Sequence, residues 1–166
     1  MFNCAQFKQY ILTPALSALQ MDSPQAQMLM LGTVATESQG GTYLAQEGGP
    51  ALGIYEMEQP THDDIWDWLG LHPIVRHRLL KVGNLSGKPD ASVMISNLLY
   101  ATAMARLLYY RIGAPIPDDL PSVAAYYKKY YNTERGSNTT EKFIIDYNNF
   151  VGGVYGQSKS EVGTRD

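Results

Sequence analysis

Apolar residues recur at helical spacing along nearly the whole chain, and this pattern predicts a mainly α protein. Proline, glycine and capping residues bound most of these stretches, as they commonly bound helices. Residues 42–58 lack the pattern and are rich in glycine, so short strands or an extended loop are expected there. The expected helices cover 4–19 (with a kink or restart at Pro14), 24–37 (capped by Asp22 or Ser23), a helix capped by Thr61, 73–83, 89–112, 120–131 and 140–150.

The length of the chain, 166 residues, is about that of one domain. We expect a single domain over residues 1–151, because helical patterning ends there. Residues 152–166 contain glycine, serine, lysine and arginine without apolar periodicity, and are expected to form a flexible C-terminal tail.

Composition excludes several classes of protein. With 45% hydrophobic and 17% charged residues, the chain can bury a core. A net charge of -3 argues against a dedicated nucleic-acid binder. Cys4 is the single cysteine, so an internal disulfide is excluded and the chain has no zinc-binding cysteine pattern.

No apolar run approaches the ~20 residues that a membrane helix needs, so membrane insertion is not expected. The moderately apolar residues 10–19 are interrupted by Thr13 and Pro14. We therefore interpret them as a structural helix and not as a secretory signal.

The main candidate for chemistry is Glu37, at the end of an apolar helical segment and just before Gly40 and Gly41. Met30, Val34 and Glu37 are spaced by four and three residues, so they share one helix face. Desolvation on an apolar face disfavours the charged form of a carboxyl group and raises its pKa. Glycoside cleavage needs such an acid to protonate the leaving oxygen.

Three blocks, in this order, resemble the soluble lytic transglycosylases, which are similar to goose-type lysozymes. Thr36-Glu37-Ser38-Gln39-Gly40-Gly41 resembles the Glu-Ser pair that ends the family's catalytic helix. Ala51-Leu52-Gly53-Ile54-Tyr55-Glu56-Met57, with Pro60-Thr61, resembles its Gly-Leu-Met-Gln block and the following turn. Ala124-Ala125-Tyr126-Tyr127 resembles its Ala-Tyr-Asn-Ala-Gly motif, and the version here looks most like those of tailed-phage proteins.

The resemblance implies a lysozyme-like helical domain with a short irregular or β-containing loop after the catalytic helix. It also implies a single acid/base, Glu37, acting on the β-1,4 bond between N-acetylmuramic acid and N-acetylglucosamine without a metal or cofactor. Tyr126 would orient Glu37 through its hydroxyl. The expected substrate-binding residues are Ser38, Gly53, Ile54, Tyr55, Glu56 and Tyr126.

Two departures from the family pattern leave alternatives open. Glu56 replaces the family's glutamine, and a second carboxylate would favour hydrolysis, as in a muramidase, over anhydro-ring formation. Tyr127-Lys128-Lys129 replaces Asn-Ala-Gly, which leaves room for a non-catalytic virion structural or ejection protein. Asp63 and Asp64 follow in sequence but are interpreted as helix-start charges.

The implied partners are peptidoglycan glycan strands and, for a phage protein, other virion proteins. The expected location is a phage virion, or the bacterial cytoplasm with delivery to the periplasm or cell wall.

Overall fold

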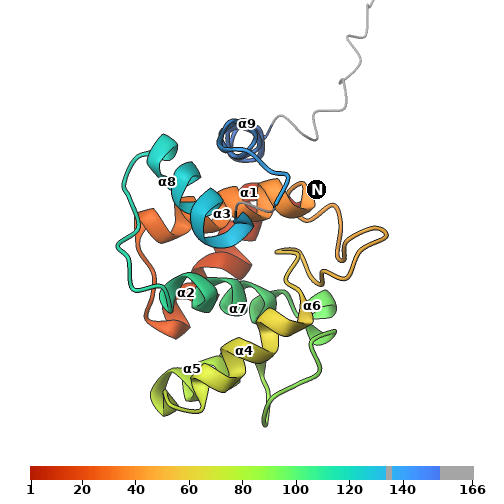
Figure 1. The fold of residues 1–166 in the computed structure, drawn as a ribbon, viewed down its shortest axis with the longest axis vertical. Coiled ribbons are helices and arrows are strands. Elements are labelled where there is room, and N and C mark those ends of the chain that lie inside the picture. The colour runs from red at the N-terminus through yellow and green to blue at the C-terminus, as the bar shows by residue number, and fades with distance from the viewer. Residues whose placement is uncertain (134–135, 154–166) are drawn as a thin grey trace, which may run out of the picture.

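The computed structural model describes residues 1–133 and 136–153, and helices make up most of it (Figure 1), which confirms the mainly α expectation. The tail expected from residue 152 lies, from residue 154 onward, outside the described residues. Of the described helices, none is both long and apolar enough to cross a membrane. The helices are α1 (Cys4–Phe7), the π-helical η1 (Lys8–Leu12), α2 (Thr13–Leu19), α3 (Pro24–Ser38), α4 (Gln59–Leu69), α5 (Pro73–Gly83), α6 (Val93–Ser96), α7 (Leu98–Tyr110), α8 (Leu120–Tyr127), the π-helical η2 (Lys128–Asn132) and α9 (Thr140–Val151).

The central helix is α3, which lies between α8 and α9 on one side and α7 on the other (Figure 1). Ser23 caps it by accepting a hydrogen bond from Ala26 N at 3.0 Å, and Pro24 occupies the first turn, where no partner for its nitrogen is needed. The helix ends where Gln39 adopts a left-handed conformation with φ 51°.

The close approach of α9 to α3 depends on Gly32. A side chain at this position would overlap the ring of Phe143, which is fully buried against α3. Only a glycine leaves room for this ring against the α3 backbone. This contact fixes the start of α9 beside the C-terminal end of α3, where Glu37 lies.

Two helix boundaries differ from expectation. The helix expected over 89–112 is divided into α6 and α7 at Asn97, whose side chain caps α7 through Tyr100 N at 3.0 Å and donates to Gly83 O at 2.9 Å. Thr61 is not a cap, because α4 begins two residues earlier, at Gln59, with Glu58 in the N-cap position.

The N-terminal segment agrees with the expected helix over 4–19 and its kink or restart at Pro14. The π-helical η1 ends at Leu12 and α2 begins at Thr13, with Pro14 in its first turn, where a residue without a backbone donor is tolerated.

Between α3 and α4 the described chain forms no strand. It has two isolated antiparallel bridges, which pair Ala45 with Leu52 and Leu52 with Met57. Leu52 and Met57 exchange both backbone hydrogen bonds, at 2.9 and 3.0 Å. They close a tight turn over residues 53–56 that packs on the helical core.

Candidate active site

A cleft of about 610 Å³ opens at the C-terminal end of α3. One wall comes from the irregular region after α3, and the other from the segment that joins η2 to α9. Its lining residues are mostly polar: Thr36, Glu37, Gln39, Tyr43, Gln46, Glu47, Ala51, Glu56, Glu58, Tyr131, Asn132, Gly136, Ser137, Asn138 and Lys142.

Glu37 is the most strongly perturbed carboxyl group in the cleft. Its pKa is raised to about 7. Burial is the largest cause and the nearby charge of Glu56 acts in the same direction, while hydrogen bonds from Tyr127 and Asn138 and the charge of Lys142 lower the pKa. At neutral pH this carboxyl group therefore exists in both protonation states, as a general acid/base requires.

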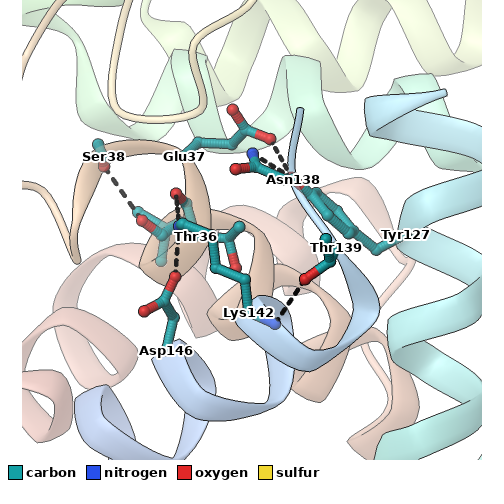
Figure 2. A network of polar contacts seen from close by, with 9 residues as sticks. Thr36, Glu37, Ser38, Tyr127, Asn138, Thr139, Lys142 and Asp146 are labelled. Atoms are coloured by element: carbon teal, nitrogen blue, oxygen red, sulfur yellow. Dashed lines mark hydrogen bonds and ion pairs between the residues drawn. The ribbon is translucent and has the colours of Figure 1, made fainter. Parts of the chain in front are cut away.

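The hydroxyl of Tyr127 donates a hydrogen bond of 2.5 Å to Oε1 of Glu37. The side-chain amide of Asn138 in turn donates to the Tyr127 hydroxyl at 2.9 Å. Figure 2 shows both side chains turned toward Glu37, one from the end of α8 and the other from the segment before α9. This chain of donors orients the carboxyl group and favours its charged form.

Lys142 places a cation on the cleft wall. Its Nζ donates to Thr36 O at 3.1 Å and pairs with Asp146 at 2.6 Å, so the ammonium is held beside the last turn of α3 (Figure 2). The positive charge lowers the pKa of Glu37 and of Glu56.

Glu56 reaches the cleft from the turn over residues 53–56. Its backbone has φ 45°, a left-handed conformation that non-glycine residues seldom adopt, and such strain is often found at functional sites. Burial raises the pKa of the Glu56 carboxyl group. A hydrogen bond from η2 holds the turn in place, because the Tyr131 hydroxyl donates to Tyr55 O at 2.5 Å.

Of the residues expected from sequence to bind substrate, the structure places only Glu56 in the cleft beside Glu37. Ser38 is fully buried and caps its own helix, donating to Val34 O at 3.1 Å and accepting from Gly41 N at 3.0 Å. Gly53, Ile54 and Tyr55 are the buried part of the turn, and they support Glu56 without lining the cleft.

The expected role of Tyr126 is corrected by the structure. Its hydroxyl donates to Ala114 O at 2.9 Å, away from Glu37, and the hydroxyl that bonds Glu37 belongs to Tyr127. Successive residues of an α-helix point about 100° apart, so neighbouring tyrosines cannot serve the same acceptor. The motif match was therefore out of register by one residue at this position.

Asn138 and Lys142 both lower the pKa of Glu37 and were not identified from sequence. No local pattern marks them, because they reach Glu37 only through the packing of α9 on α3. Asp63 lies elsewhere, between buried His62 at 3.0 Å and Lys88 at 2.8 Å, and Asp64 pairs with Arg111 at 2.7 Å.

Within the described residues, no group of three or more histidine, cysteine, aspartate or glutamate side chains could hold a metal ion. Comparisons with protein-family models, with curated proteins and with solved structures found no match.

Proposed function

We propose that this protein is a peptidoglycan-cleaving enzyme, a lytic transglycosylase or a muramidase, with Glu37 as its acid/base. The observation that carries the proposal is the carboxyl group of Glu37, with its pKa raised to about 7, facing an open polar cleft. The motif resemblance of the sequence supplies the substrate, the β-1,4 bond between N-acetylmuramic acid and N-acetylglucosamine.

In the proposed first step, protonated Glu37 gives its proton to the glycosidic oxygen as the bond to the muramyl C1 breaks. The positive charge that develops on the sugar is stabilised by the substrate's own acetamido group. Tyr127 and Lys142 then stabilise the carboxylate that remains, since both favour its charged form.

In the second step the same carboxylate takes a proton from the attacking hydroxyl group. Attack by the 6-hydroxyl of the muramyl sugar closes an anhydro ring, whereas attack by water gives the hydrolysed sugar. Glu56, which replaces the family's glutamine, lines the same cleft. A second carboxyl group there favours the hydrolytic alternative.

The test compares the parent with Glu37→Gln on purified cell walls, measuring soluble muropeptides by mass spectrometry. Removing a general acid is expected to lower the rate by about 10²–10⁴-fold. Glu141→Gln makes the same chemical change on the exposed first turn of α9, outside the cleft, and should match the parent.

The products also decide between the two reactions, because anhydro muropeptides weigh one water less than hydrolysed ones. Equal release by the parent and Glu37→Gln would refute the catalytic role of Glu37. Saccharide binding without any muropeptide release by the parent would instead favour the non-catalytic virion role.

A further inference from the structure

A buried cation lies far from the cleft described above. Arg106, on α7, exposes only 8% of its surface. Its Nε donates to Met21 O at 3.2 Å, and its guanidinium lies 6.0 Å from the centre of the Tyr110 ring. An arginine carries five N–H donors. In the described part of the chain, the hydrogen bond of Arg106 uses Nε, and its terminal nitrogens are not among the fully buried atoms that lack a partner.

No carboxylate in the described part of the chain neutralises this guanidinium. The ionisable groups close enough to affect it are Tyr126, Tyr110 and Tyr109. Two acids near this region in sequence have neutral donors as partners: Asp22 accepts from the Gln27 side chain and Asp119 from Ser122 N. A buried charge without a counter-charge is unfavourable, and a bound anion would offset that cost.

Arg106 lines a separate pocket of about 390 Å³. The first turn of α3 opens into the same pocket, through Ser23 and Gln25. The backbone N–H of Gln25 belongs to this turn and has no acceptor within the helix. The positive end of a 15-residue helix thus adds to the charge of the guanidinium.

The remaining walls of the pocket are aromatic or aliphatic. Tyr109, Tyr110 and Tyr126 form one side, and Ile116 lies on the loop between α7 and α8. The pocket is larger than a bare ion requires, and flat apolar surfaces of this kind pack against rings or alkyl groups.

We propose that this pocket binds a small organic carboxylate. The Arg106 guanidinium and the first turn of α3 hold the carboxylate, and the ring or alkyl body of the ligand packs between the tyrosines and Ile116. Arginine suits this ligand because its planar fork matches the two carboxylate oxygens. Gln25 and Glu37 lie near opposite ends of α3, about 18 Å apart along the helix at 1.5 Å per residue, so this site is separate from the cleft.

The test is a titration of the ¹⁵N-labelled protein with benzoate and, separately, with benzamide, which has the same shape but no charge. Benzoate is expected to shift the amide signals of Gln25, Gly113 and Ala114, and benzamide to bind about tenfold more weakly or not at all. Equal binding of the two probes, or benzoate shifts confined to residues around Glu37 and Lys142, would overturn the proposal.

Two variants and a second anion sharpen the result. Arg106→Gln keeps a donor for Met21 O but removes the charge, and should lose benzoate binding; retention would contradict the proposal. Should this variant fail to fold, Arg106→Lys keeps the charge without the fork and should bind benzoate more weakly than the parent. Inorganic phosphate is expected to bind more weakly than benzoate, and equal binding would refute the role of the apolar walls.

Discussion

At the scale of single residues, the pKa of Glu37 depends on opposing influences, of which burial is the largest. Burial and the charge of Glu56 favour the protonated carboxyl group, whereas Tyr127, Asn138 and Lys142 favour the carboxylate. The resulting pKa of about 7 lets one residue donate a proton and then accept one without a large penalty in either step. Removing any one neighbour should therefore change the activity in a direction that can be stated beforehand.

The two adjacent tyrosines provide a matched pair of variants. Tyr127→Phe removes the hydrogen bond to Glu37, raises the pKa of its carboxyl group and should lower the rate of cell-wall cleavage by about tenfold or more. Tyr126→Phe removes only the bond to Ala114 O and should leave the rate within about twofold, because one neutral hydrogen bond far from the reacting atoms is lost. Equal losses in both variants, measured by muropeptide release, would contradict the assignment.

The pH dependence gives a second prediction. Cleavage requires protonated Glu37, so the rate should fall as the pH rises through about 7. Glu56→Gln removes a negative charge that raises the Glu37 pKa, and should move this fall to lower pH. Lys142→Gln removes a positive charge that lowers it, and should move the fall to higher pH. Rate profiles between pH 5 and 9 on cell walls measure both shifts. Shifts of the same sign in the two variants would disprove this electrostatic description.

At the scale of elements, the turn over residues 53–56 determines where Glu56 lies. Gly53 has φ 75°, and a Cβ placed on it would lie 2.7 Å from the backbone oxygen of Met94. The turn therefore packs directly against α6, and the Leu52–Met57 pairing closes it. This restraint keeps the left-handed Glu56 on the cleft wall.

Gly53→Ala should destabilise the fold by about 2–4 kcal/mol, through a positive φ and a clash with rigid backbone. Gly48→Ala is the control, because Gly48 also has a positive φ, 68°, but its added Cβ would meet nothing within 4 Å. It should cost only about 1 kcal/mol. Urea unfolding measures both free energies, and equal costs would mean that the Met94 contact does not constrain the turn.

Helix positions follow largely from local sequence, and the exceptions have specific causes. Ser23-Pro24 and Gly83-Asn84 mark helix ends that the structure confirms, because caps act within a few residues. The break at Asn97 was missed since apolar residues continue on both sides of it. Its side chain bonds Gly83 O, a contact between segments distant in sequence that no periodicity reveals.

At the scale of the whole molecule, α3 joins two regions of different chemistry. Its last turn presents Glu37 to the cleft, and its first turn opens into the pocket that holds Arg106. The helix is buried over most of its length, which gives both regions a rigid support. The sequence predicted that an apolar helix ends at Glu37, next to where α3 ends, but contained no sign of the arginine pocket.

What the sequence could not predict at this scale is how distant segments assemble around Glu37. Packing of α9 against Gly32 brings Asn138 and Lys142 to the cleft from about a hundred residues away in sequence. The choice between Tyr126 and Tyr127 depends on the rotation of α8, which a motif match does not fix. Local patterns thus located the acid, and tertiary packing determined its partners.

The most direct test is a measurement of the Glu37 pKa. A ¹³C NMR titration of the glutamate side-chain carboxyl groups, with the signal of Glu37 assigned by its disappearance in Glu37→Gln, gives this value. We expect a midpoint near pH 7, as a buried acid requires. A midpoint near 4.5, the ordinary value for glutamate, would mean that Glu37 is a carboxylate throughout the neutral range and cannot act as the proton donor.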